Sequence, residues 1–260
     1  MTREVVVVKV GTSTLVSREL SGAERLDAAS FERIGSQINQ LHSDGADVVL
    51  VTSAAITAGM IQTGLRKRPE ELLAKKRLAS LGAPAIFTAW SDVITAPSPS
   101  LLLTRHSLQI QHDDDELGPL LAYMLAERDV PLINENDAIA SEEIRFGDND
   151  TLSATVAIRI KKLGGEGGEA VSLVMLSDVE GVYADRSDPA TRIPCIDDIA
   201  AYEQLAAGVD SPHGTGGMQT KFEAAKLATA AGIPTYIAHG RREMAIIDAL
   251  QGKTGTKFAV

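Results

Sequence analysis

The sequence predicts an α/β sandwich built on a mainly parallel β-sheet. Short apolar runs alternate with segments of helical periodicity along the chain, and these runs are nearly continuous in hydrophobic residues. Parallel strands are covered by helices on both faces, so they show continuous apolar runs rather than alternating patterns. Strands that alternate with helices indicate βαβ connections and therefore a parallel sheet.

Six runs are expected to form buried strands: Val5–Val10, Val48–Thr52, Leu101–Thr104, Pro131–Asn134, Val171–Ser177 and Thr235–Ala238. Between Phe31 and Leu41, apolar residues recur every three or four positions, and Gly45 follows where a C-terminal cap is expected. Three further segments show helical patterns: Leu117–Arg128, Leu152–Leu163 and Phe222–Ala231. Residues 96–100 are predicted to form a stiff connector and residues 164–168 a flexible surface loop.

Composition limits the class of protein. The 260 residues, 44% of them hydrophobic, can bury one large domain or two closely fused lobes. A formal charge of -10 disfavours binding to a nucleic-acid backbone. The single cysteine, Cys195, excludes an intrachain disulfide, and no run approaches the ~20 apolar residues that span a bilayer. We expect a cytoplasmic protein with neither nucleic acid nor membrane as a partner.

The first predicted strand ends in a turn with phosphate-binding character. Lys9 precedes Gly11, Thr12 and Ser13, and a glycine past a buried strand lets backbone N–H groups approach a ligand. The turn matches neither a Walker A loop nor a dinucleotide-binding fingerprint. Taken alone, Lys9 is interpreted more simply as an exposed charge at a strand end.

The second glycine-rich turn, residues 214–221, gives a stronger signal. Clustered glycines precede a helix, where backbone N–H groups and the helix dipole favour an anion. Lys221 falls in the first helical turn, where a cation opposes the dipole, and a residue placed against its local preference indicates a function. The turn therefore favours phosphate binding over the alternative, a flexible loop followed by a solvated lysine.

Polar residues occur at the end of a further predicted strand and at the start of the helix that follows it. Asn134 to Asp137 follow a buried strand, and Asp148 to Asp150 open the next helix. Ligand sites of open parallel sheets lie at such strand ends. One of these residues suffices to cap the helix, so the others face solvent or a site.

Two other strand ends carry small or polar residues. Ser53 and Ala54 suit either the approach of a carboxylate or tight helix–strand packing, and the sequence favours neither interpretation over the other. Asp178 and Gly181 form a turn that can reach a nucleotide. The five scattered His and the single Cys do not suit zinc, and no Gly-x-Ser-x-Gly elbow is present.

These motifs together resemble those of the glutamate 5-kinases, within the amino-acid-kinase superfamily. The resemblance covers nearly all of the chain and rests on six segments: residues 8–13, 51–53, 133–138, 146–154, 178–183 and 214–221. It implies a three-layer fold with an eight-stranded, mainly parallel sheet. An acceptor-binding lobe would occupy about residues 1–165 and a nucleotide-binding lobe about residues 166–260. The implied reaction is ATP-dependent phosphorylation of the glutamate γ-carboxylate, the first step of proline biosynthesis.

The resemblance also implies residue roles. Lys9 and Lys221 would flank the transferring phosphoryl group, and Asp150 would orient them. The glutamate would contact Ser53, Asp137 and Asn149. ATP would contact Lys9, Gly11, Thr12, Ser177, Asp178, Thr215, Gly216, Gly217, Met218, Gln219, Thr220 and Lys221. Mg²⁺ would be held through the ATP phosphates without protein ligands, and the chain would form a homo-oligomer that passes its product to glutamate-5-phosphate reductase.

The sequence departs from the family pattern at several places. Ala54 stands where the family usually has Gly, Ser177 where it has Thr, and Gln219 where it has Ser. The stretch 109–121 lacks the usual asparagine–alanine–arginine pattern, and the chain ends at Val260 where many members continue into a PUA domain. Two rival hypotheses follow: a kinase for a different amino acid or small acid, and a non-catalytic ligand-binding module. A dinucleotide oxidoreductase is a distant third.

Overall fold

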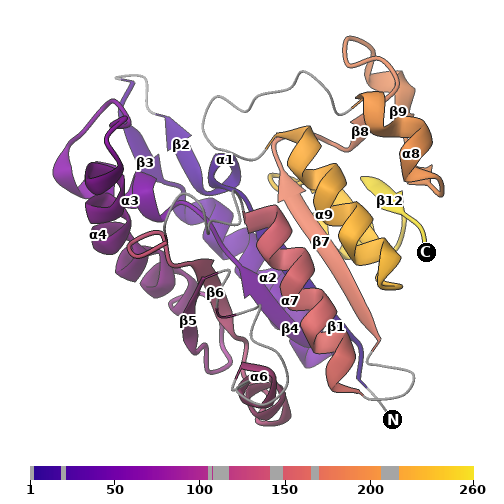
Figure 1. Ribbon diagram of the computed structural model, residues 1–260, viewed down its shortest axis with the longest axis horizontal. Helices are drawn as coiled ribbons and strands as arrows, with labels where there is room; N and C mark the ends of the chain where they lie inside the picture. The colour runs from indigo at the N-terminus through magenta and orange to yellow at the C-terminus, as the bar shows by residue number, and fades with distance from the viewer. Residues whose placement is uncertain are drawn as a thin grey trace.

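The computed structural model describes residues 3–18, 22–104, 107, 117–140, 149–164, 170–205 and 217–260, and arranges them in three layers (Figure 1). The middle layer is an eight-stranded sheet with the order β10-β12-β11-β7-β1-β4-β6-β5. Neighbouring strands are parallel except β11 and β12, which are antiparallel. The predicted α/β sandwich with a mainly parallel sheet is therefore confirmed. Its strands are β1 (Val5–Val10), β4 (Asp47–Val51), β5 (Ser100–Leu103), β6 (Leu132–Glu135), β7 (Val171–Ser177), β10 (Cys195–Ile196), β11 (Thr235–His239) and β12 (Thr256–Phe258).

Helices cover both faces of the sheet. On one face lie α6 (Leu117–Ala126), α7 (Asn149–Leu163) and α9 (Met218–Ala230). On the other lie α2 (Ala28–Ser43), α4 (Leu72–Ser91) and α10 (Ala245–Leu250). The remaining elements connect these layers: α1 (Thr12–Leu15), β2 (Val16–Arg18), β3 (Glu24–Leu26), α3 (Ala55–Thr63), β8 (Val182–Tyr183), the 3-10 helix η1 (Pro189–Thr191), β9 (Arg192–Ile193), α8 (Ile199–Tyr202) and the 3-10 helix η2 (Glu203–Leu205). Within the described ranges, no helix is both long and apolar enough to cross a bilayer.

The side chains of the central strand β1 alternate between the two faces of the sheet. Every residue of β1 is buried, and successive side chains of a strand point to opposite faces. Val5 and Val7 belong to the hydrophobic cluster shared with α7 and α9, whereas Val6 and Val8 belong to the cluster shared with α2 and α4. The alternation therefore directs Lys9 to the face of α7 and α9.

The six predicted strands are all present, and the predicted helical segments correspond to α2, α6, α7 and α9. The long helix α4 was not predicted, because Gly82 and Pro84 lie inside it and both residues disfavour a helix. Tertiary contact explains the glycine. A Cβ at Gly82 would lie 1.9 Å from the Ala55 carbonyl oxygen, so α4 packs directly on the backbone of α3. Most of the predicted loop 164–168 lies outside the described residues.

Ala54, directly before α3, adopts left-handed geometry with φ 80° and ψ 7°. This conformation costs an alanine about 1–2 kcal/mol. Its methyl group belongs to the hydrophobic cluster on the α2 and α4 side of the sheet. A glycine at this position would therefore avoid the strain but lose a buried methyl group.

Substituting glycine at Ala54 is expected to change the free energy of unfolding by less than about 1 kcal/mol, because strain relief offsets lost burial and added chain entropy. Ala58→Gly, in regular helix and also buried, is the matched control and is expected to destabilise by about 1.5–2 kcal/mol. Urea unfolding of both variants measures the difference. Equal destabilisation at the two positions would show that Ala54 carries no strain.

Candidate active site

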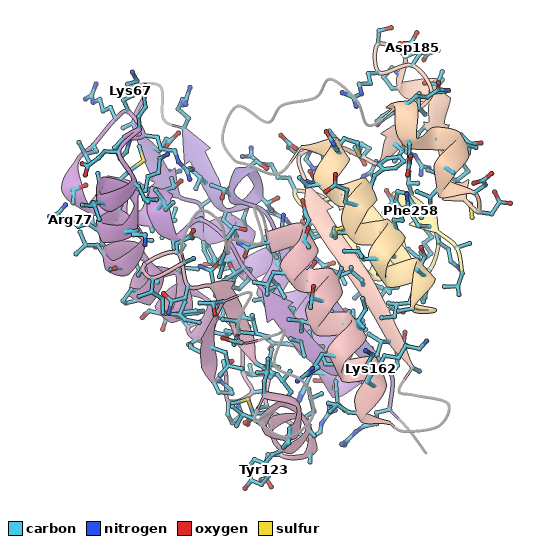
Figure 2. All side chains as sticks on the ribbon, in the orientation of Figure 1. Lys67, Arg77, Tyr123, Lys162, Asp185 and Phe258 are labelled. Carbon is cyan, nitrogen blue, oxygen red and sulfur yellow. The ribbon has the colours of Figure 1, made fainter. Side chains whose placement is uncertain are left out.

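Two buried lysines contact one buried aspartate near the carboxyl end of strand β1. The Lys9 Nζ lies 2.7 Å from the Asp150 Oδ1, and the Lys221 Nζ lies 3.1 Å from the Asp150 Oδ2. Both lysines are 5% exposed and Asp150 is fully buried. Lysines elsewhere, such as Lys67 and Lys162, extend outward (Figure 2). These three side chains, two ammonium groups and one carboxylate, together carry one formal positive charge.

Three elements bring this triad together. Lys9 is the fifth residue of β1, and its side chain faces the layer of α7 and α9. Asp150 lies in the first turn of α7, and Lys221 lies in the first turn of α9. The two helices run side by side across the same face of the sheet (Figure 1). Their packing therefore converts three distant sequence positions into one charged cluster.

Burial alone would raise the pKa of Asp150, because a charge loses solvation inside a protein. The positive charges of Lys9 and Lys221, together with their hydrogen bonds, outweigh burial and hold the pKa of this carboxyl well below its ordinary value. Asp150 therefore stays ionised at neutral pH and fixes both ammonium groups. A triad with one surplus positive charge suits an anionic ligand.

A second polar cluster lies beside the triad. The Asn149 Nδ2 donates to the Ser53 Oγ at 2.9 Å and to the Asn134 Oδ1 at 3.1 Å. The backbone N–H of Glu135 donates to the Asn149 Oδ1 at 3.4 Å. The predicted acceptor residues Ser53 and Asn149 are thus in direct contact. Because Asn149 directly precedes Asp150 in the chain, the two clusters share the start of α7.

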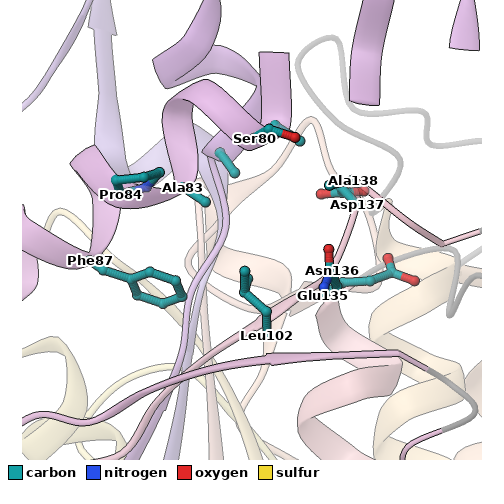
Figure 3. Close-up of a pocket in the computed structure, with 11 residues that line it drawn as sticks. Ser80, Ala83, Pro84, Phe87, Leu102, Glu135, Asn136, Asp137 and Ala138 are labelled. Carbon is teal, nitrogen blue, oxygen red and sulfur yellow. The ribbon is translucent and has the colours of Figure 1, made fainter. Parts of the chain in front are cut away.

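Asp137 lines a cavity of about 440 Å³. Side chains of α4, including Ala83, Pro84 and Phe87, form one wall, and the segment from Glu135 to Ala138 forms the other (Figure 3). The cavity adjoins the hydrogen-bonded Ser53–Asn149 pair, because Ala55 and Glu135 line it as well.

The end of β7 lies next to the first glycine turn. The Gly11 backbone N–H donates to the Leu176 carbonyl oxygen at 3.4 Å, which places Ser177 and Asp178 close to this turn. The Ser177 Oγ donates to the Asp178 Oδ1 at 3.1 Å. A Cβ at Gly11 would lie 3.5 Å from the Lys9 Nζ, so glycine leaves the space beside this ammonium group open. Thr12 begins the short helix α1.

The described residues of the second glycine turn, from Gly217 onward, differ in burial and in the groups that they contact. Thr215 and Gly216 lie outside the described residues. Gly217 is the N-cap of α9, and its carbonyl oxygen lies 3.5 Å from the Lys221 Nζ. Met218 packs into the hydrophobic core, and Gln219 donates to Glu223 at 3.3 Å. These two side chains thus contact other parts of the protein.

Two residues near the site were not assigned from the sequence. Asn134 lies in the polar run at the end of a buried strand, and this position is the feature of the sequence that points to it. Arg241 donates to the carbonyl oxygens of Ser13 and Val16 at 3.2 and 3.1 Å and so braces α1. No local pattern connects Arg241 with the first glycine turn.

The chain is similar to known proteins over nearly its whole length. The profile of the Amino acid kinase family matches residues 4–239. Glutamate 5-kinase of Streptococcus suis is 38% identical over 99% of this chain and 71% of its own length. The Thermus thermophilus glutamate 5-kinase is 38% identical over 97% of this chain and 66% of its own length. The protein of that name from Symbiobacterium thermophilum is 36% identical over 98% of this chain and 95% of its own length.

Solved structures give the same fold at low sequence identity. Carbamate kinase from Giardia lamblia bound to AMP-PNP superposes with a TM-score of 0.67 at 16% identity and covers 99% of this chain and 98% of its own. Isopentenyl phosphate kinase superposes with a TM-score of 0.63 at 18% identity and covers 98% of this chain and all of its own. These two likenesses concern the fold. The family match and the sequence relatives show that the chain belongs to the amino acid kinase family and, within it, to the glutamate 5-kinases.

Proposed function

We propose that the protein transfers the γ-phosphoryl group of ATP to the γ-carboxylate of L-glutamate and forms glutamate 5-phosphate, the first step of proline biosynthesis. The buried cluster of Lys9, Asp150 and Lys221 carries this proposal, because it offers two fixed cations to a phosphate in transit. The glutamate 5-kinases that are 36–38% identical to the chain support glutamate as the acceptor.

The chemistry suits a site that has cations but needs no general base. A carboxylate is already ionised at neutral pH, so it can attack phosphorus without losing a proton. The barrier is the repulsion between two anions and the charge on the equatorial oxygens of the moving phosphoryl group. Lys9 and Lys221 would stabilise that charge, and the fixed carboxylate of Asp150 would hold them in place before the reaction starts.

The residues present fit nucleotide-bound magnesium. Each oxygen of Asp150 already contacts a lysine Nζ, which supports binding of Mg²⁺ through the ATP phosphates rather than through this carboxylate. Bound through the ATP phosphates, Mg²⁺ would supply charge neutralisation at the transferring group. Gly11, Thr12, Ser177 and Asp178 would hold the nucleotide together with the turn at residues 215–221.

The acceptor side is proposed to lie within residues 1–165 and the nucleotide side within residues 166–260. Ser53, Asn149 and Asp137 would bind glutamate, with Asp137 as a counter-charge for its ammonium group. The hydrogen-bonded Ser53–Asn149 pair supports the first two, and the position of Asp137 in the neighbouring cavity supports the third.

Asp137→Ala is expected to raise KM for glutamate by about 10–100-fold, as for a lost hydrogen bond to a charged group. The KM for ATP, measured on the same variant, is expected to stay within twofold and serves as the internal control. Steady-state kinetics with each substrate varied in turn provides both values. An unchanged KM for glutamate would remove Asp137 from the acceptor site.

A hydroxylamine trap tests the activity directly. Incubation with MgATP, glutamate and hydroxylamine is expected to give a coloured hydroxamate, because hydroxylamine captures an acyl phosphate. Aspartate in place of glutamate is expected to give none. Product with another acid alone would support the rival acceptor, and ATP binding without turnover on any acceptor would support the non-catalytic hypothesis.

Three further proposals follow from the family. The protein would act in the cytoplasm, form a homo-oligomer, and pass its labile product to glutamate-5-phosphate reductase. Size-exclusion chromatography with light scattering tests the oligomer. A coupled assay with the reductase, in the presence of a competing nucleophile, tests the transfer of the acyl phosphate.

A further inference from the structure

The hydroxyl group of Thr220 contacts the carboxylate that holds the two lysines. The Thr220 Oγ1 lies 2.9 Å from the Asp150 Oδ2 and 2.9 Å from the Gly217 carbonyl oxygen. A hydroxyl group has one proton, so it donates to one of these acceptors at a time. A charged acceptor forms the stronger hydrogen bond, which favours donation to Asp150.

Three side chains from two elements therefore contact Asp150. Lys9 of β1 binds the Oδ1, while Thr220 and Lys221 of α9 share the Oδ2. The Lys221 Nζ also lies 3.5 Å from the Gly217 carbonyl oxygen. An ammonium group has three N–H donors, so these two contacts leave one for a phosphate oxygen.

We propose that the hydroxyl group of Thr220 positions Asp150 and Lys221 and is not a direct ligand of the nucleotide, so that Thr220 would contribute to the nucleotide-binding turn through its backbone alone. A lysine ammonium sits on a flexible four-carbon stem, so its place depends on the group that it contacts. The Thr220 hydroxyl fixes the Oδ2 of Asp150 relative to the start of α9, and the Oδ2 in turn fixes the ammonium group of Lys221. The catalytic consequence rests on the proposed function, whereas the hydrogen bond itself does not.

Kinetics can separate positioning from nucleotide binding. Thr220→Val keeps the side-chain shape and removes the hydroxyl group, and we expect kcat to fall about tenfold with KM for ATP unchanged within twofold. Thr220→Ser restores the hydroxyl group and is expected to recover kcat to within about twofold of wild type. A tenfold rise in KM for ATP at unchanged kcat would overturn the proposal, because it would make Thr220 a nucleotide ligand.

The chain offers a matched control on the same helix. The Thr229 Oγ1 donates to the Ala225 carbonyl oxygen at 2.8 Å and lies 3.4 Å from the Lys226 carbonyl oxygen, so this hydroxyl group contacts the backbone of its own helix. Thr229→Val removes a helix hydroxyl group of the same kind, so we expect kcat and both KM values to remain within twofold of wild type. A tenfold loss of kcat in Thr229→Val would assign the Thr220 effect to helix packing and overturn the proposal.

A second measurement requires no turnover. In the ligand-free protein, NMR of the Lys221 side-chain ¹⁵N and of the Asp150 carboxyl ¹³C reports the contact directly. We expect both signals to shift in Thr220→Val and to return in Thr220→Ser. Unchanged signals in Thr220→Val would overturn the proposal. If the wild-type protein fails to phosphorylate glutamate, the proposed function falls, and these spectra still decide the role of Thr220.

Discussion

Replacement of Lys221 or Lys9 by alanine is expected to lower kcat by ~10²–10³, about 3–4 kcal/mol of transition-state stabilisation, as for other electrostatic groups removed from active sites. Each lysine is 5% exposed and bound to Asp150, so its charge acts in a dry site where water cannot replace it. Because the charge matters most when the phosphoryl group is in transit, kcat should change more than KM for ATP.

The control for this prediction is a lysine on the same helix as Lys221. Lys226 is paired with Glu203 at 2.6 Å, and its side chain is 64% exposed. Lys226→Ala is expected to leave kcat within twofold of wild type, because solvent screens its charge. Hydroxamate formation under saturating substrates measures all three variants. A kcat within a factor of a few of wild type in Lys221→Ala would remove that lysine from phosphoryl transfer.

Asp150→Asn is expected to lower both the stability and the rate. The substitution removes the carboxylate that both buried ammonium groups contact, and breaking a buried ion pair in this way costs about 3–5 kcal/mol. The ammonium groups would then repel each other and lose their fixed positions, so we expect kcat to fall by ~10² or more. Urea unfolding and the hydroxamate assay measure the two effects.

ATP should partly restore the stability of Asp150→Asn, since its phosphates bring negative charge to the uncovered lysines. Asp92→Asn changes an exposed carboxylate and is the matched control. It should alter neither the free energy of unfolding nor kcat. Wild-type stability and rate in Asp150→Asn would show that the lysines do not depend on this carboxylate. Loss of stability with full kcat would limit Asp150 to a structural role.

The pKa of Asp150 sets the sign of the pH dependence. The folded-state pKa lies well below the ordinary value of 3.8, so the carboxylate stabilises the protein fully above pH 3.8. This contribution is lost as the pH falls from 3.8 through the folded-state pKa. The stability gap between wild type and Asp150→Asn should therefore be constant near neutral pH and shrink only below about pH 4.

The sequence alone determined the fold class, the six main strands and the segments that meet in the candidate site. These features are local, because continuous apolar runs indicate buried parallel strands and a glycine-rich turn with a lysine favours an anion. Even the unfavourable placement of Lys221 in the first turn of a helix was visible before the structure. The sequence did not predict helix α4. Its Gly82 disfavours a helix locally, and this glycine is explained only by the contact with Ala55 of another helix.

Tertiary structure decided which of these residues meet. The strand order places β1 between β7 and β4, and the packing of α7 beside α9 brings Asp150 between the two lysines and within reach of Thr220. Sequence spacing cannot report such contacts, because Asp150 and Lys221 are 71 residues apart. Local patterns record burial and periodicity, whereas the position of a charge relative to its partner depends on how separate elements pack.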